Sequence, residues 1–204
     1  YFLILGSLML WRRENKALSY TFFFLCLTSF MWHFGFAMMF RAHSYEEAFL
    51  IAKIAWSFIV FLPTLLYHFL VILSGKKGEM RAVLFSYSLA FIFLLFLPFS
   101  NLLISGVQVL FLGFYPKHGP LEIFHIAQTM IVVTRGLYLL YESQKKSAYK
   151  RKIQIQYAIG GAILLLGAID YLGSYYYIEF YPPGVFCFGI GLTILNYTVI
   201  KGKL

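Results

Sequence analysis

Seven apolar runs, separated by short polar segments, divide the chain. They cover residues 1–11, 18–41, 47–73, 81–98, 121–142, 153–173 and 183–200. A helix needs about 20 apolar residues to cross a bilayer, and a chain in lipid must satisfy its backbone hydrogen bonds within its own segment. We therefore predict an all-α, polytopic membrane bundle of seven transmembrane helices. Run 1–11 is too short to span alone, so we expect its start to be truncated.

The composition argues against a soluble domain. Hydrophobic residues make up 61% of the chain and charged residues 12%, and the mean hydropathy is +0.77. Soluble domains carry about 25% charged residues. A net charge of +9 would suggest nucleic-acid binding in a soluble protein, but here the basic residues lie in loops between apolar runs. We expect the lipid bilayer as a partner and no nucleic acid.

The basic residues also predict an orientation. Every second loop is basic, at 12–16, 76–81, 145–152 and 201–203, and these segments hold thirteen of the seventeen lysines and arginines. The opposite loops hold only Arg41 and Lys117. Positive loops stay in the cytoplasm, which places the N-terminus outside and the C-terminus in the cytoplasm. We expect residues 1–204 to form a single transmembrane domain, with a cytoplasmic output domain outside this chain.

The long connection at 99–120 has a pattern of its own. Its VQVLFLGFY segment is rich in β-forming residues and is bounded by Ser-Gly and by Pro-Lys-His-Gly-Pro. This pattern is typical of a β-hairpin, which would lie over the outer mouth of the bundle. An irregular loop at the membrane interface is the alternative.

Ionisable residues inside membrane spans are costly, so each one raises a functional hypothesis. The predicted orientation places them in two layers. The outer layer contains His33, Lys53, Glu122, His125 and Asp170, and the inner layer contains His68, Arg135 and Asn196. Candidate ligand-binding residues are His33, Lys53, Trp56, Glu122, His125, Gln128 and Asp170, and candidate signalling or structural residues are Pro63, His68, Arg135 and Asn196.

Several of these residues allow more than one interpretation. Lys53 either reaches the outer interface, pairs with Asp170 or Glu122, or contacts a ligand. The histidines either form interhelical hydrogen bonds or bind a ligand. Arg135 is expected to extend toward the cytoplasm, and Pro63 to kink its helix.

No pattern indicates a cofactor or a reaction. The five histidines and two cysteines show no metal-ligand spacing, and there is no phosphate loop or catalytic triad. The last run has no lysine before Lys201, which argues against a retinal Schiff base there. Cys26 and Cys187 are expected to be buried free thiols. Gly160, Gly161 and Gly167 favour close helix packing. We expect no metal, no cofactor and no catalytic residues in this chain.

Several segments together resemble a known family. They are WRRENKALSYTFFFLCLTSFMWHFGFA, IAKIAWSFIVFLPTLLYHFLVILSGKK, KRKIQIQYAIGGAILLLGAIDYLGSYYYIEFYPPG and NYTVIKGKL. The set is similar to the seven-helix N-terminal sensor region of bacterial histidine kinases, which is also found ahead of diguanylate cyclase domains. The elements that match in order are Lys150–Lys152, Gly160–Gly167, Asp170, Tyr181–Gly184 and Lys201–Leu204. The ending KGKL departs from the family's more Arg-rich ending.

The resemblance implies a multi-pass sensor in the bacterial inner membrane. The resemblance further implies that helix 183–200 signals to a cytoplasmic histidine kinase domain in a homodimeric full-length protein. From the outer polar layer and the long connection at 99–120, we expect a small or lipophilic ligand to bind in the outer half of the bundle. A diguanylate cyclase output is one alternative. A small-molecule transporter or channel is another, although the two halves of the sequence show no inverted repeat.

Overall fold

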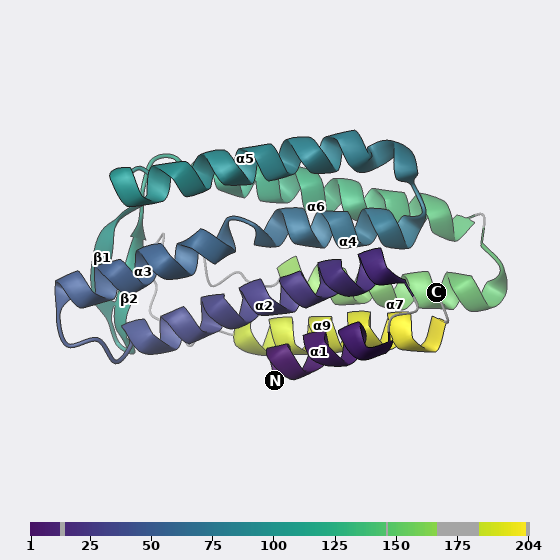
Figure 1. Ribbon diagram of the computed structural model, residues 1–204, viewed down its shortest axis with the longest axis horizontal. Coiled ribbons are helices and arrows are strands. Elements are labelled where there is room, and N and C mark those ends of the chain that lie inside the picture. The colour runs from purple at the N-terminus through teal and green to yellow at the C-terminus, as the bar shows by residue number, and fades with distance from the viewer. Residues whose placement is uncertain (13–14, 146, 167–183, 203–204) are drawn as a thin grey trace.

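The computed structural model describes residues 1–12, 15–145, 147–166 and 184–202. Most of them are helical. The elements are α1 (Phe2–Arg12), α2 (Lys16–Met39), α3 (Tyr45–Ile59), α4 (Leu62–Ser74), the short 3₁₀ helix η1 (Lys77–Glu79), α5 (Met80–Phe99), β1 (Ile104–Leu110), β2 (Gly113–His118), α6 (Glu122–Lys145), α7 (Tyr149–Leu166) and α9 (Gly184–Gly202). The helices lie along one common long axis (Figure 1).

Four described segments are long and apolar enough to cross a membrane: Lys16–Met39, Tyr45–Ser74, Lys77–Phe99 and Glu122–Lys145. Phe2–Trp11 and Gly184–Ile200 are shorter apolar helices. The predicted helical bundle is therefore confirmed. The count of seven spans and the direction of each across the membrane remain predictions.

The two ends of the bundle differ in character. The C-terminal ends of α1, α4, α6 and α9 lie at one end of the bundle (Figure 1). We call this the basic end, because its connections carry the basic loops. The strands and the α2–α3 turn lie at the opposite end, which we call the hairpin end (Figure 1). The loops that were predicted to share one side of the membrane thus share one end of the structure.

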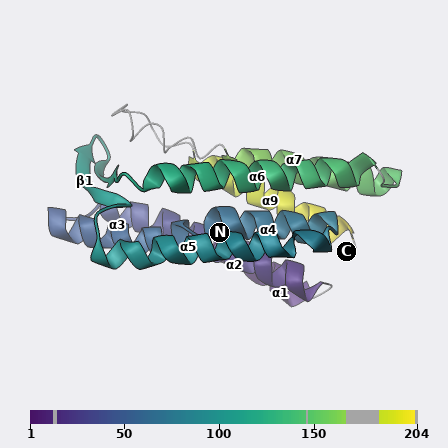
Figure 2. The ribbon, with the colours of Figure 1, turned by 90° about the horizontal axis from the view of Figure 1, so that it is seen from above.

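Helix α4 lies at the centre of the bundle. Eleven of its thirteen residues are buried, and it packs against α2, α5 and α6. Helix α7 lies beside α6 and packs closely on α9 (Figure 2). By contrast, α5 buries only Val83, Ser86, Ala90, Phe93 and Leu97. This three- and four-residue spacing leaves the other apolar faces of α5 for contact with lipid.

The run Tyr45–Ser74 is broken into two helices. Helix α3 ends at Ile59, α4 begins at Leu62, and Pro63 lies in the first turn of α4. Proline has no backbone N–H, and its ring clashes with the carbonyl of the residue four positions earlier. The predicted kink at Pro63 is therefore confirmed, and it takes the form of a helix break.

The long connection folds as an antiparallel β-hairpin, which confirms the first of the two alternatives. Leu110 pairs with Gly113 across a two-residue loop, and the register shifts between Ile104 and Gly106. The Tyr115 ring lies 5.2 Å from the Phe36 ring and 6.0 Å from the Phe40 ring. The hairpin is therefore anchored to the end of α2.

The cysteines are free thiols, as expected. Of the two predicted packing glycines that the structure describes, Gly161 makes the expected close packing, whereas a Cβ atom added at Gly160 would meet nothing within 4 Å. Cys26 is a buried free thiol, and Cys187 is a partly buried free thiol. Gly161 of α7 faces Gly191 of α9, and a Cβ atom added at Gly161 would lie 3.0 Å from the Gly191 carbonyl oxygen. Gly167 lies outside the described residues.

Candidate functional site

The polar residues of α6 lie on one face of that helix. Glu122, His125 and Gln128 are spaced by three residues and are all buried. Such spacing places side chains on the same side of a helix. Three candidate site residues therefore point from α6 into the bundle, toward α3, α4 and α5.

Glu122 and His125 form a buried cluster beneath the hairpin. The Glu122 side chain has 0% exposure and contacts the imidazole of His118, at the end of β2. The Trp56 ring lies 5.8 Å from the His125 ring and 6.3 Å from the His118 ring. A carboxylate in the first turn of a helix is also favoured by the helix dipole. His118 was not among the predicted site residues, because it lies in the loop and not in an apolar run.

Gln128 joins three helices. Its side-chain Nε2 donates to the Ser86 hydroxyl (2.9 Å), to the Ser86 carbonyl oxygen (3.1 Å) and to the Thr64 hydroxyl (3.3 Å). The two hydroxyl groups are themselves 2.6 Å apart. This network connects α4, α5 and α6 in the apolar interior.

We expect Ser86→Ala to lower the stability of the bundle by about 1 kcal/mol, which is the usual scale of a polar contact between membrane helices. Gln128 and Thr64 would each lose their hydroxyl partner on α5. Unfolding in a detergent and denaturant series measures the change. Ser88→Ala is the matched control, because the Ser88 hydroxyl is exposed and, among the described residues, bonds only to the Leu84 carbonyl of its own helix. Equal stability of the two variants would contradict a bridging role for Ser86.

Two other outer-layer residues, His33 and Lys53, do not join this cluster. Nδ1 of His33 lies 2.7 Å from the Ser29 carbonyl oxygen of the same helix, and the His33 ring packs against Phe2 and Phe188. The Lys53 ammonium lies 4.6 Å from the centre of the Phe49 ring.

No ion pair of Lys53 occurs among the described residues. Of the alternatives for Lys53, a pair with Glu122 is therefore wrong, because Glu122 contacts His118 instead. Asp170 lies outside the described residues, so its pairing with Lys53 stays a prediction.

The inner-layer residues each tie two elements together. Nδ1 of His68 lies 3.2 Å from the Tyr87 hydroxyl of α5, and Nδ2 of Asn196 donates to the Leu5 carbonyl of α1 at 3.2 Å. The Arg135 guanidinium pairs with Glu79 in η1, and Tyr67 donates to the same carboxylate at 2.8 Å. Arg135 thus extends toward the basic end, as expected.

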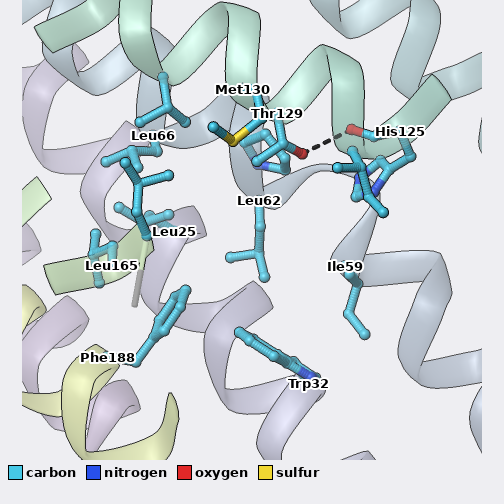
Figure 3. Close-up of a pocket in the computed structure, with 14 residues that line it drawn as sticks. Leu25, Trp32, Ile59, Leu62, Leu66, His125, Thr129, Met130, Leu165 and Phe188 are labelled. Carbon is cyan, nitrogen blue, oxygen red and sulfur yellow. Dashed lines mark hydrogen bonds between the residues drawn. The ribbon is translucent and has the colours of Figure 1, made fainter. Parts of the chain in front are cut away.

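A cavity of about 370 Å³ lies inside the bundle next to the α3–α4 break. We call it the chamber (Figure 3). Its lining residues come from α2, α3, α4, α6, α7 and α9 and are Leu25, Trp32, Ile59, Leu62, Pro63, Leu66, His125, Ile126, Thr129, Met130, Val133, Leu165, Leu166 and Phe188. Of these, only His125 and Thr129 are polar apart from the Trp32 indole N–H. Two candidate residues from the sequence, Pro63 of α4 and His125 of α6, therefore both line the chamber.

The chamber suits binding better than catalysis. Its size falls in the range of ligand pockets, which are mostly apolar with a few polar groups. Among the residues that the structure describes, no group of three His, Cys, Asp or Glu side chains is placed to hold a metal ion.

The sequence comparison finds one family. A family profile described as the N-terminal 7TM region of histidine kinase matches residues 1–204. No curated protein and no solved structure matches the chain.

Proposed function

This chain belongs to the family of N-terminal seven-transmembrane regions of histidine kinases, and from that membership we propose that it detects a small or lipophilic ligand in the hairpin half of its bundle and signals through α9 to a cytoplasmic kinase domain. It is a multi-pass membrane protein, and the family is a sensor region and not a catalytic domain. The bacterial inner membrane is the proposed location.

The chamber is the observation that carries this proposal. Its wall includes Pro63, at the break between α3 and α4, and Phe188, on α9. A ligand in the chamber would therefore contact both the break between α3 and α4 and the output helix α9. A ligand changes a signal only if it binds one arrangement of the helices more tightly than the other. The helix break supplies a point where two arrangements can differ.

A second contact connects the central helix to the output helix at the basic end. Nη2 of Arg151, in the first turn of α7, donates to the Leu73 carbonyl oxygen in the last turn of α4 at 2.6 Å. A cation at this position also complements the negative end of the α4 dipole. Because α7 packs closely on α9, a movement of α4 would reach α9 through Arg151.

The test replaces Arg151 by methionine in the full-length protein, reconstituted in liposomes. We expect the basal rate of autophosphorylation to change roughly fivefold in either direction, because about 1 kcal/mol of bias between the two arrangements would be lost. Lys150→Met is the matched control, since Lys150 is the exposed neighbouring cation, and it should leave the rate unchanged.

Equal rates in the two variants and in the wild type would overturn the proposed path through Arg151. The output itself is checked by reading the sequence that follows Leu204. A phosphoaccepting histidine helix with an ATP-binding domain supports a kinase output, whereas a diguanylate cyclase domain would overturn it.

A further inference from the structure

We propose that the chamber binds an uncharged, single-chain amphiphile from the bilayer, such as a medium-chain alcohol, with its hydroxyl group held by His125. This inference deepens the proposed function, because it names the class of ligand and the residue that recognises its polar group.

The lining of the chamber argues against a charged ligand. No lysine, arginine, aspartate or glutamate is among its described lining residues. The nearby Glu122 already contacts His118. A charged group that enters an apolar site without a partner loses its hydration and gains nothing in return. An apolar chain, by contrast, fills the space between Leu62, Leu165 and Phe188 (Figure 3).

His125 supplies a polar contact for this ligand. Its side chain is 3% exposed, and neither ring nitrogen has a hydrogen bond of normal geometry among the described residues, although the Val60 carbonyl lies nearby. A neutral imidazole offers one donor and one acceptor. Buried polar atoms normally have partners, so a hydroxyl group that reaches His125 would complete its bonding.

Thr129 limits which polar group the ligand can carry. Its hydroxyl already donates to the His125 carbonyl oxygen at 2.8 Å, so it can only accept a hydrogen bond from a ligand. An alcohol can accept from the imidazole or donate to Thr129, whereas a ketone can only accept. The pair His125 and Thr129 therefore favours a hydroxyl group.

The rim and the size of the chamber indicate the source and length of the ligand. Met130 lines the chamber and is 55% exposed on α6, so the chamber reaches a surface that is apolar and faces lipid. A volume of about 370 Å³ lies at the small end of the range for ligand pockets, roughly 300–1,000 Å³. A single medium-length chain with one hydroxyl group fits this volume.

The test uses a tryptophan in the chamber wall as reporter. Trp32 lines the chamber and is 5% exposed, whereas Trp11 is 83% exposed. In the full-length protein carrying Trp11→Phe and Trp56→Phe, in liposomes, we expect 10-bromo-1-decanol to quench the fluorescence with a saturable component. This component should be lost when Trp32→Phe is added. Quenching that rises linearly without saturation would overturn the proposal.

Two substitutions locate the site. Val133→Phe fills the chamber and should remove the saturable component, whereas Val185→Phe, the same change at an exposed position of α9, should leave it intact. His125→Phe should weaken binding of 10-bromo-1-decanol roughly three- to tenfold, the worth of one hydrogen bond, and leave binding of 1-bromodecane unchanged. Equal saturable quenching in Val133→Phe and the wild type, or equal weakening of both probes by His125→Phe, would overturn it.

Autophosphorylation, measured in the same liposomes, separates this inference from the function on which it rests. Saturable, Val133-dependent binding with no change in kinase rate would overturn the proposed function and keep the ligand site. A change in kinase rate that persists in Val133→Phe would keep the proposed function and overturn the chamber as the site.

Discussion

Replacing Gly191 with leucine should force α7 and α9 apart and uncouple the sensor from its output. A Cβ atom at this position would lie 2.8 Å from the Gly161 carbonyl oxygen and 2.9 Å from Cδ2 of Leu165. A backbone carbonyl cannot rotate away as a side chain can, so the helices must separate. We expect a loss of about 1–3 kcal/mol in the free energy of unfolding and a fall of roughly tenfold or more in stimulus-dependent autophosphorylation, because 1.4 kcal/mol corresponds to tenfold.

Gly160→Leu is the matched control for this prediction. Gly160 precedes Gly161 on α7, but a Cβ atom there would meet nothing within 4 Å. This variant should retain wild-type stability and signalling in the same detergent-unfolding and kinase assays. If Gly191→Leu also retained both, the close approach of α7 and α9 would not be required for signalling.

The contact at Gly191 matters because of what holds membrane helices together. Lipid tails are as apolar as leucine, so burial of apolar surface gives little net attraction between helices inside a bilayer. Close approach of backbones at small residues then contributes much of the packing. Ala158 and Ala162 are buried beside Gly161 on α7, so small residues form the middle of its buried face, between Ile155 and Leu165.

The sequence predicted the features that are determined by short segments of the chain. Apolar run length predicted the helices, because a chain in lipid has few other ways to satisfy its backbone. Pro63 predicted the helix break, because the clash it creates involves only its own helix. The basic loops predicted which connections share one end, since they alternate along the chain.

The site was less predictable, because it depends on how helices rotate and where the loop folds. Depth alone placed Lys53 beside Glu122, yet Lys53 lies over the Phe49 ring of its own helix. The partner of Glu122 is His118, four residues earlier in the chain, at the point where β2 turns into α6. The chamber follows from gaps between helices and leaves no local pattern. One signal was available, since Ser86 is a polar residue inside the apolar run 81–98 and is a possible partner for Gln128.

The second large effect is expected at the hairpin. Gly113 has φ of +125°, a conformation that side chains rarely adopt, and a Cβ atom there would lie 2.7 Å from the carbonyl oxygen and 2.9 Å from the Cα of Phe40. Gly113→Ala therefore combines backbone strain of about 1–3 kcal/mol with a clash against the backbone at the end of α2. We expect the hairpin to lift from α2, with hydrogen exchange of peptides covering 104–118 accelerated roughly 100-fold.

Gly75→Ala separates the two causes. Gly75 ends α4 with φ of +72°, but nothing lies within 4 Å of an added Cβ atom, so only strain of about 1–2 kcal/mol applies and exchange should rise locally by roughly tenfold. Because His118 and Glu122 meet beneath the hairpin, the displaced hairpin of Gly113→Ala should also expose Glu122, the outermost buried residue of α6. If exchange around residues 118–125 stayed at the wild-type rate while that of 104–116 rose, the hairpin would be an independent cover and not a part of the candidate site.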